Sequence, residues 1–483
     1  MSLTHFRPQK RTKIVATLGP ASSDKKILTA MIKAGLNTAR LNFSHGDHDS
    51  HAKTIAILRE LSESLNCPIA IMGDLRGPRI RVGEIENGSV ALKTGQTFKL
   101  VPDTCLGNAD RVSMSYPKLA RDVSPGSRIL LDDGSIEVAV TRILSGDTIE
   151  GTIVRGGVLS SRRGINVPGI HLNIPPLTEK DLIDIDFAVA QELDYLALSF
   201  VQSASDVQTL KTILRAKRSD IEVVAKIEMS GGLADIHAIV EEADGIMVAR
   251  GDMALEMSYE EVPVAQKRII AICRQHAVPV ITATQMLESM ITASKPTRAE
   301  VTDVANAVFD GTDALMLSAE TAIGQYPLEV IQTMTRVAAR AERAWLDDEV
   351  PCLPEIEPDP SVGEIISLSS AMAAESLDSA TIVTYTRSGR TARRISRFRP
   401  SAPILVLTPN KRTYQKLVLS WGVNPILIDD LDNTDLMTKT AIKHAKSLGL
   451  ADPGDHVIVT AGNPAGPPGN TNILRVETVE TDS

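Results

Sequence analysis

Hydrophobic positions along the chain fall into short runs rich in Val, Ile, Leu and Ala, and most runs precede a longer segment whose apolar residues recur every three or four positions. A short buried strand followed by an amphipathic helix is the repeating unit of parallel α/β folds. Eight such runs predict the eight strands of a closed (β/α)8 TIM barrel. The predicted strands are Lys13–Leu18, Thr38–Phe43, Pro68–Asp74, Tyr195–Phe200, Glu222–Ile227, Gly245–Ala249, Pro279–Ala283 and Ala314–Leu317.

One connection between predicted barrel strands is much longer than the others. About 120 residues separate the third strand from the fourth, and most of them form short alternating segments broken by Gly, Asn and Asp, which is typical of a small all-β domain. The loops that follow barrel strands leave on the catalytic face, so a domain inserted there is placed to act as a lid. Its predicted strands are Thr97–Val101, Arg128–Leu131, Ile136–Val140 and Thr148–Val154.

The C-terminal part of the chain is predicted to be a separate α/β domain with an open sheet. It follows a helix at Leu328–Leu346 and a segment, Asp347–Pro360, whose four prolines and six carboxylates predict a linker. Its expected elements are a helix, Val362–Leu377, and strands at Ala380–Tyr385, Ile404–Leu407, Pro425–Ile428 and Val457–Thr460. The predicted division is a barrel from 1–78 and 168–346, an inserted lid at 79–167, a linker at 347–360 and a C-terminal α/β domain at 361–483.

Composition and charge restrict the classes of function. The 51 basic residues against 60 acidic ones give a net charge of −9, which argues against broad binding of nucleic acid or anionic membranes. Aromatic residues make up only 3% of the chain, so platforms for base stacking are scarce. The four cysteines lie far apart and predict neither disulfides nor a zinc site. No apolar run is long enough for a membrane span, and Met1–Arg11 has no signal-peptide core, so we expect a cytoplasmic protein.

Charged and polar side chains recur where the predicted barrel strands end. In a barrel, the carboxyl ends of the strands contact the substrate. A solvated loop explains any one of these residues, but it does not explain their recurrence at six strand ends beside strands nearly free of charge. The segments are Arg40–His45, Asp74–Arg76, Lys226–Glu228, Ala249–Asp252, Thr284–Gln285 and Ser318–Thr321.

Lys226, Glu228 and Asp252 suggest a metal-assisted site. Lys226 and Glu228 are two positions apart, so their side chains are expected to point the same way. Two carboxylates without His or Cys suit Mg²⁺ or Mn²⁺, and a lysine beside the metal would stabilise charge developing on an oxygen. A buried ion pair between Lys226 and a carboxylate is the alternative. Arg40 adds an anchor for phosphate or carboxylate. These residues leave phosphoryl transfer and enolate chemistry both open.

Seven ordered segments resemble the pyruvate kinase family. The resemblance runs from about residue 11 to the C-terminus, with the inserted domain in the expected place. A lone Arg-Gly-Asp would indicate nothing, but the whole ordered set is specific. The segments are Lys13–Ser22 (KIVATLGPAS), Ala39–Gly46 (ARLNFSHG), Gly245–Asp252 (GIMVARGD), Ala283–Met290 (ATQMLESM), Pro296–Glu300 (PTRAE), Asp303–Val308 (DVANAV) and Met316–Thr321 (MLSAET).

The resemblance implies a role for each matching residue. Glu228 and Asp252 would be the divalent-metal ligands, and Lys226 would stabilise the transferring phosphoryl group and the resulting enolate. Arg40, the backbone around Gly251 and Asp252, and Thr284 would hold phosphoenolpyruvate, with Thr284 near the route of proton delivery. Contacts to ADP or ATP would come from Asn42, Phe43, Ser44, His45, Arg81 and Arg162, the last of which is usually Lys in the family.

One departure from the family concerns the monovalent cation. Where the family often has Asp-Thr-Lys-Gly-Pro-Glu-Ile-Arg-Thr, this chain has Asp74-Leu-Arg-Gly-Pro-Arg-Ile-Arg-Val82, so Arg79 replaces a Glu. In potassium-requiring members that Glu accompanies K⁺ held by residues matching Asn42, Ser44, Asp74 and the carbonyl of Leu75. A guanidinium would supply the positive charge itself and repel K⁺. We therefore predict activity without K⁺; the alternative is that Arg79 points to solvent and the K⁺ site remains.

The C-terminal domain contains a predicted phosphate-binding loop. Thr386, Arg387, Ser388, Gly389, Arg390 and Thr391 stand between a strand and a helix and match the family's loop for a sugar-phosphate effector. Arg393, Arg394, Arg397 and Arg399 follow, and a solvated helix face also explains Arg394 and Arg397. The loop Gly462–Gly469 would face this site. The resemblance also implies a homotetramer. Two other classes of function are considered. The inserted domain and the nucleotide-side arginines argue against a barrel lyase or aldolase, and the intact Lys226, Glu228, Asp252 and Thr284 argue against a catalytically silent sensor.

Overall fold

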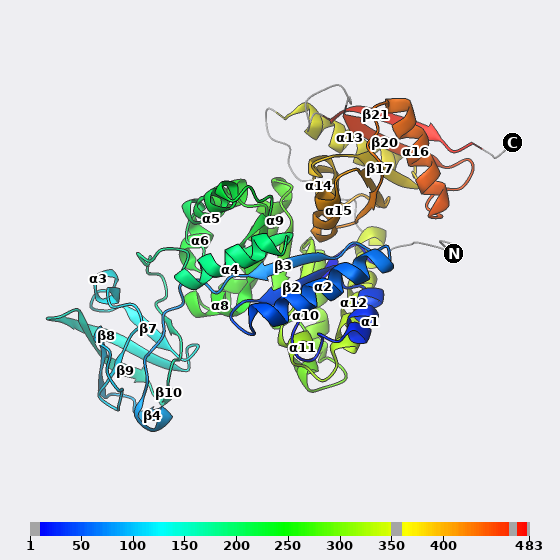
Figure 1. Ribbon diagram of the computed structural model, residues 1–483. Helices are drawn as coiled ribbons and strands as arrows, with labels where there is room; N and C mark the ends of the chain where they lie inside the picture. The colour runs from blue at the N-terminus through cyan, green and yellow to red at the C-terminus, as the bar shows by residue number, and fades with distance from the viewer. Residues whose placement is uncertain (1–9, 349–359, 463–470, 481–483) are drawn as a thin grey trace.

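The computed structural model describes residues 10–348, 360–462 and 471–480, and a closed eight-stranded barrel lies at its centre (Figure 1). Around the barrel the strand order is β1-β16-β15-β14-β13-β12-β3-β2, and the neighbouring strands are parallel. This confirms the predicted TIM barrel. The strands are β1 (Lys13–Thr17), β2 (Thr38–Asn42), β3 (Ala70–Asp74), β12 (Tyr195–Leu198), β13 (Glu222–Ile227), β14 (Gly245–Ala249), β15 (Val280–Ala283) and β16 (Ala314–Leu317).

Five of the eight barrel strands differ from the prediction by one or two residues at one end, and two of these boundaries have clear local reasons. The third strand begins at Ala70 instead of Pro68, since proline has no N–H to donate to a ladder. The fourth ends at Leu198 because Phe200 has a φ of 58°, outside the strand region. That turn directs the Phe200 amide toward the barrel centre, where it contacts the candidate site described below.

Helices cover the outside of the barrel, and their ends follow ordinary capping chemistry. The first begins where the Asp24 carboxylate accepts from two backbone amides and ends at Gly35, whose φ of 117° suits glycine. A capping box of Thr297 and Glu300 starts another. The helices of this part are α1 (Lys25–Ala34), α2 (His48–Ser64), α4 (Glu179–Ala190), α5 (Ala204–Ala216), α6 (Ser230–Ala234), α7 (Ile236–Glu242), α8 (Arg250–Glu256), α9 (Glu261–Gln275), η2 (Glu288–Ile291), α10 (Arg298–Phe309), α11 (Ala319–Ala322) and α12 (Pro327–Asp348).

Alternation along the barrel strands produces two apolar layers. Ile14 and Ala16 face the surrounding helices, whereas Val15 between them faces the barrel interior. The interior layer also includes Val418 and Leu419, which come from the C-terminal domain. The end of the barrel at which its strands begin, here called the barrel floor, is therefore closed by residues more than 400 positions from the first described residue.

The segment between β3 and α4 forms a β domain with a core of its own, built around residues such as Phe98, Leu100 and Ile129. Its six-stranded sheet has the order β11-β7-β8-β9-β5-β6, and β10 pairs with β4. The elements are η1 (Glu86–Gly88), β4 (Ser89–Leu92), β5 (Thr97–Val101), β6 (Arg111–Ser113), α3 (Leu119–Asp122), β7 (Arg128–Leu131), β8 (Ile136–Leu144), β9 (Thr148–Arg155), β10 (Gly157–Ser160) and β11 (Ile165–Asn166).

The C-terminal domain is an open sheet of order β19-β18-β17-β20-β21, parallel except for the edge strand β21. The prediction missed β21, whose residues are mostly half-exposed. The strands are β17 (Thr381–Tyr385), β18 (Ile404–Thr408), β19 (Val423–Leu427), β20 (His456–Gly462) and β21 (Thr471–Thr478), and the helices are α13 (Val362–Ser376), α14 (Arg390–Ser396), α15 (Lys411–Lys416), η3 (Leu417–Leu419) and α16 (Thr434–Ser447).

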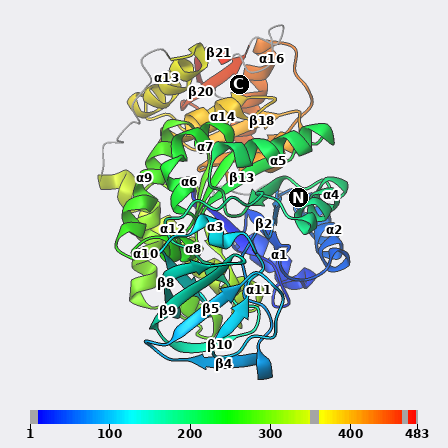
Figure 2. The same cartoon turned by 90° about the vertical axis from the view of Figure 1, so that its left-hand side faces the viewer.

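The inserted lid and the C-terminal domain lie at opposite ends of the barrel (Figures 1 and 2). No helix in the described ranges is long and apolar enough to span a membrane. Three expectations concern residues outside those ranges: most of the Met1–Arg11 segment, most of the linker, and the loop after Gly462 that was expected to face the effector site.

Candidate active site

Four strands bring Arg40, Asp74, Ser199 and Lys226 together at the carboxyl end of the barrel. Asp74, at the end of β3, lies between two cations. Its Oδ2 accepts from Arg40 Nε at 2.6 Å, and its Oδ1 is 3.4 Å from Lys226 Nζ. Lys226 Nζ also donates to Ser199 Oγ at 2.7 Å and is 2.9 Å from Glu228 Oε1. The predicted catalytic lysine and its carboxylate neighbour are therefore in direct contact.

The charges in this cluster shift one another's pKa values. Burial alone would raise the pKa of Asp74, but Arg40 and Lys226 outweigh it and hold that pKa below its usual range. Burial opposes the charge on Lys226, yet the carboxylates of Asp74 and Glu228 raise its pKa. Burial raises the pKa of Glu228 to about 7, with Lys226 opposing the rise and Asp252 adding to it. Lys226 therefore keeps its positive charge beside two carboxylates.

The backbone after β12 fixes the Glu228 carboxylate. Glu228 is 1% exposed, and its Oε2 accepts from the Phe200 amide at 2.7 Å. The positive φ of Phe200 places this amide there. The sequence offered no signal for this contact, because a positive φ at phenylalanine is not visible in a residue pattern.

Gly251, Asp252 and Thr284 form a second group on neighbouring strand ends. Thr284 Oγ1 accepts from the Gly251 amide at 2.8 Å, and Thr284 and Gln285 have consecutive positive φ values of 70° and 54°. Such a conformation is costly for residues with a Cβ and occurs where the surroundings enforce it. Arg250 enforces it here, donating to the Thr284 carbonyl at 2.6 Å.

Asp303 orients Arg250 and was missed by the sequence analysis as a site residue. Its two carboxylate oxygens lie 2.7 and 2.8 Å from the two Nη atoms of Arg250, a bidentate pair. Asp303 stands in one of the family-like motifs, which is the signal that would have found it. Glu320, also at a strand end, is 3% exposed and accepts from the Ser318 amide at 2.7 Å, so it supports the loop between strand and helix.

Glu228 and Asp252 are the carboxylates available to a divalent cation. The described residues contain no group of three or more His, Cys, Asp or Glu side chains arranged for a metal. Two carboxylates nevertheless fit Mg²⁺ or Mn²⁺, which often keep several water ligands and take the remaining oxygens from a substrate. Asp252 raises the pKa of Glu228, which is the effect of two carboxylates in proximity.

The predicted nucleotide residues lie in two places. The Ser44 amide donates to Asn42 Oδ1 at 3.1 Å, and His45 is exposed in the same turn. Phe43 is 2% exposed, with its ring packed on Phe187, so a ligand would reach only its backbone. On the lid, Arg81 Nη1 donates to the carbonyl of Arg162 at 3.0 Å. Within the described residues, no hydrogen bond or ion pair joins these arginines to the Asn42–His45 turn.

Asp74 and the Leu75 carbonyl, two of the groups expected around a monovalent cation, already make protein contacts, and Arg79 is not among their partners in the described part of the chain. The Leu75 carbonyl accepts from Ser199 Oγ at 2.8 Å, and Asp74 is bonded as above. Arg79 Nη2 instead lies 2.5 Å from Asp133 Oδ1 on the lid. Its guanidinium also adjoins Gly164, at the return from the lid to the barrel.

The predicted effector loop surrounds the start of α14. The Gly389 amide, with a φ of 80° at this residue, donates to Thr386 Oγ1 at 3.0 Å, and the Thr391 hydroxyl contacts that of Thr471. Arg387 pairs with Asp430 at 3.0 Å. Ser388 and Arg390 are exposed.

Three of the four arginines after this loop, Arg393, Arg397 and Arg399, bind the barrel floor, whereas Arg394 adjoins Gly363 within the C-terminal domain. Arg397 is 4% exposed and donates to the Gln275 carbonyl at 2.6 Å, so the interpretation of Arg397 as part of a solvated helix face was wrong. Arg393 Nη2 lies 2.5 Å from Glu222 Oε2 at the start of β13. Arg399 is 1% exposed and pairs with Asp313 at 3.1 Å.

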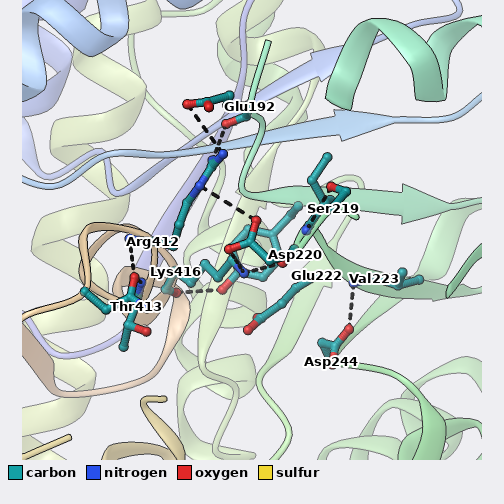
Figure 3. A network of polar contacts seen from close by, with 12 residues as sticks. Glu192, Ser219, Asp220, Glu222, Val223, Asp244, Arg412, Thr413 and Lys416 are labelled. Carbon is teal, nitrogen blue, oxygen red and sulfur yellow. Dashed lines mark hydrogen bonds and ion pairs between the residues drawn. The ribbon is translucent and has the colours of Figure 1, made fainter. Parts of the chain in front are cut away.

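Helix α15 makes a second set of contacts with the barrel floor (Figure 3). Arg412 donates to the Glu192 carbonyl at 2.7 Å, Lys416 Nζ donates to the Asp220 carbonyl, and Tyr195 donates to the Lys416 carbonyl at 2.6 Å. Thr413, between them, donates to the Arg387 carbonyl at 2.7 Å. The effector loop is thus tied to α15, and α15 to the starts of the barrel strands.

Comparisons with known proteins agree with this architecture. A family model described as pyruvate kinase, barrel domain, matches residues 9–331, and one described as pyruvate kinase, alpha/beta domain, matches residues 364–477. A pyruvate kinase of Geobacillus stearothermophilus is 44% identical over 474 residues, 98% of this chain and 81% of the relative. One of Clostridium acetobutylicum is 41% identical over 98% of this chain and all of the relative.

A solved structure gives the same result. A crystal structure of a pyruvate kinase from Cryptosporidium parvum superposes with a TM-score of 0.90 at 37% identity, covering 98% of this chain and 96% of that one. Fold, site and relatives together define a phosphotransferase built on a TIM barrel with an inserted lid. The chain belongs to the pyruvate kinase family.

Proposed function

We propose that this enzyme transfers the phosphoryl group of phosphoenolpyruvate to ADP, yielding ATP and pyruvate as a step of glycolysis, with Mg²⁺ or Mn²⁺ and without a need for K⁺. The observation that supports this most strongly is the position of Lys226, in contact with Glu228 and Asp74 and on the strand next to the one that leads into Gly251 and Asp252. A fixed cation there is suited to charge that develops during phosphoryl transfer.

Each residue of the cluster has a separate part in the proposed reaction. Arg40, oriented by Asp74 and Thr17, would bind the phosphate of phosphoenolpyruvate. The bond from phosphorus to the enol oxygen breaks as a bond to the terminal phosphate oxygen of ADP forms. Lys226 would stabilise the transferring group and the enolate oxygen left behind. The enolate then takes a proton at its methylene carbon, on a route near Thr284.

Glu228 and Asp252 would hold the divalent cation, which when bound neutralises charge on substrate oxygens. The Phe200 amide fixes the Glu228 carboxylate at 2.7 Å. Asp252 and Gly251 lie in the first turn of the same helix. The proposed metal ligand and the backbone proposed to hold the substrate are therefore positioned by one element.

The lid would complete the nucleotide site. We propose that Asn42, Ser44, His45 and the Phe43 backbone contact the nucleotide from the barrel, with Arg81 and Arg162 from the lid. Arg162 is highly exposed and pairs only with Glu84 among the described residues, so it is available to a phosphate. Closure of the lid would exclude the water that hydrolyses the donor.

Independence from K⁺ is proposed because Arg79 brings a positive charge where potassium-requiring members have a Glu. Arg79 is half-buried and paired with Asp133 of the lid, so the positive charge of its own guanidinium is held at the junction of lid and barrel. Pyruvate formation from phosphoenolpyruvate, ADP and Mg²⁺ tests both proposals, with K⁺ or tetramethylammonium at constant ionic strength. Equal rates in the two salts support K⁺ independence, whereas activity in K⁺ alone overturns it.

A pair of lid arginines provides a matched control for Arg79. Arg79→Glu should introduce a dependence on K⁺. Arg163→Glu removes a neighbouring exposed cation that pairs with Asp132 at 3.2 Å, and it should leave the ratio of rates in the two salts unchanged. If neither salt supports turnover in the wild type, even with added sugar phosphates, the kinase proposal itself fails.

Regulation, assembly and boundaries are further proposals. We propose that Thr386–Thr391 bind a sugar-phosphate or nucleotide effector, since Ser388 and Arg390 are exposed there. Pyruvate formation is measured for wild type and Ser388→Asp with such compounds added, and the response should be lost in the variant.

A cytoplasmic homotetramer is proposed from family resemblance. The separate apolar cores support the division into 1–78 with 168–346, 79–167 and 361–483.

A further inference from the structure

A small cavity lies between the barrel floor and the C-terminal domain. Asp313 and Arg274 line it from the barrel, and Arg393, Arg397, Arg399 and Ser420 line it from the other side. The cavity has a volume of about 10 Å³. That is enough for a single small particle and too little for a polyatomic oxyanion.

Three side-chain groups lining this cavity have no protein hydrogen-bond partner in the described residues: Nε of Arg393, Nε of Arg399 and Oγ of Ser420. Arg399 and Ser420 are each 1% exposed. The other guanidinium nitrogens of Arg399 are satisfied, since Nη1 donates to Asp313 and Nη2 to the Gly311 carbonyl. Leaving a buried donor without a partner is costly, so an occupant that accepts hydrogen bonds is favoured.

The charge around the cavity has the same implication. Among the described residues that line it, four are arginines and only Asp313 is a carboxylate. Arg393 pairs with Glu222 and Arg397 with Glu364, but both of these carboxylates lie outside the lining. The lining therefore presents mostly positive charge to the space inside, in an interface where little water screens it.

We propose that this cavity binds one monatomic anion, such as chloride, which bridges the barrel floor and the C-terminal domain. Both unpartnered nitrogens are donors, and the Ser420 hydroxyl can also donate. An anion accepts from all three and is stabilised by the positive lining. A water molecule could also accept from the two nitrogens and donate one hydrogen to Ser420 Oγ, but it carries no charge and would not offset the positive lining. The site does not depend on the proposed catalytic activity.

The first test is diffraction from crystals of the full chain grown in sodium bromide. An anomalous peak at the cavity, within hydrogen-bond distance of Arg399 Nε and Ser420 Oγ, is expected. Ser420→Asp should abolish this peak, since it places a carboxylate where the anion binds. Absence of the peak in wild-type crystals, or density for water alone, overturns the proposal.

The second test measures thermal unfolding in sodium chloride, sodium bromide and sodium gluconate at equal ionic strength. Wild-type Tm should rise by about 1–3 °C with either halide and then saturate, as expected for a ligand that binds only the folded state. Ser420→Asp should lose this rise, whereas Ser124→Asp, an exposed substitution on the lid, should keep it. An equal halide response in Ser420→Asp and wild type overturns the proposal, and Ser420→Ala, expected to need more halide, replaces Ser420→Asp if that variant does not fold.

Discussion

Replacement of Glu256 by glutamine should stabilise the enzyme at alkaline pH. Glu256 ends α8, the helix that begins with Arg250, Gly251 and Asp252, and it is 5% exposed. Burial raises its pKa from 4.5 to about 7, and the nearby Gly169 amide and Asn166 side chain offset only part of that effect. Neither carboxylate oxygen makes a hydrogen bond of good geometry within the described residues.

The sign and size follow from linkage between protonation and folding. Between pH 4.5 and about 7 the folded protein retains a proton on Glu256 that the unfolded chain releases. The contribution of Glu256 to the free energy of unfolding is therefore fully present below pH 4.5 and is lost as the pH rises to about 7. At about 1.4 kcal/mol per pKa unit, the difference amounts to about 3 kcal/mol. A glutamine side chain at this position has the same shape and no charge to bury, so Glu256→Gln avoids this loss.

The assay is urea unfolding of wild type and Glu256→Gln near pH 5 and near pH 8.5, with a chelator present so that no divalent cation binds at Asp252. The variant should exceed the wild type by up to about 3 kcal/mol at the higher pH and by much less at the lower one. Glu300 supplies a control of opposite sign. Hydrogen bonds from Ser289 and Thr297 outweigh burial and hold its pKa below the usual value of 4.5, so its contribution to stability is already nearly complete near pH 5, and Glu300→Gln should destabilise by about the same amount at both pH values. An equal difference between Glu256→Gln and wild type at both pH values would show that the folded protein does not raise the pKa of Glu256.

Two further predictions concern the barrel floor and the catalytic end. Leu419 is fully buried in the barrel interior, so Leu419→Ala should cost about 2–5 kcal/mol of unfolding free energy. Leu427 is 45% exposed, so Leu427→Ala should change this free energy little. Urea unfolding measures both variants, and equal effects would contradict the burial of Leu419 in the barrel. Asp303→Asn should lower kcat about 10–100-fold, because Arg250 then loses its bidentate partner and positions Thr284 less well. Steady-state kinetics measure kcat, and an unchanged value would show that Thr284 is held by other contacts.

Most of the barrel was predictable because its chemistry is local. Runs such as Gly245–Ala249 are apolar at every position, as expected of strands buried on both faces, and the structure has that strand unchanged. The edge strand β21 was not predictable in this way. Seven of its eight residues are half-exposed or exposed, and its partner strand β20 comes alongside only when the domain folds.

The sequence was enough to predict which residues form the candidate site, but not which contacts those residues make. Arg40, Lys226 and Glu228 stood out as charges at strand ends, and the structure brings Arg40 and Lys226 to opposite sides of Asp74. The Phe200 amide on Glu228 depends on a backbone conformation with no sequence pattern.

The interface between the domains was not predictable, for a related reason. An arginine-rich helix has the same local pattern whether it faces solvent or a second domain. Arg397 and Arg399 are buried only because the barrel floor offers them a carbonyl and the Asp313 carboxylate. Leu419 likewise becomes buried in the barrel interior only once both domains are folded, so its local sequence does not predict this position.

The turnover of Lys226→Met measures directly whether Lys226 stabilises the transferring phosphoryl group. Pyruvate formation from phosphoenolpyruvate, ADP and Mg²⁺ would be followed for wild type, Lys226→Met and Lys25→Met, the last a surface lysine paired with Glu60. The account predicts an active wild type, an unaffected Lys25→Met, and a loss of at least about 10²–10³ in kcat for Lys226→Met, the size seen when a group that stabilises transition-state charge is removed. A Lys226→Met enzyme that kept a tenth or more of wild-type kcat would contradict the account.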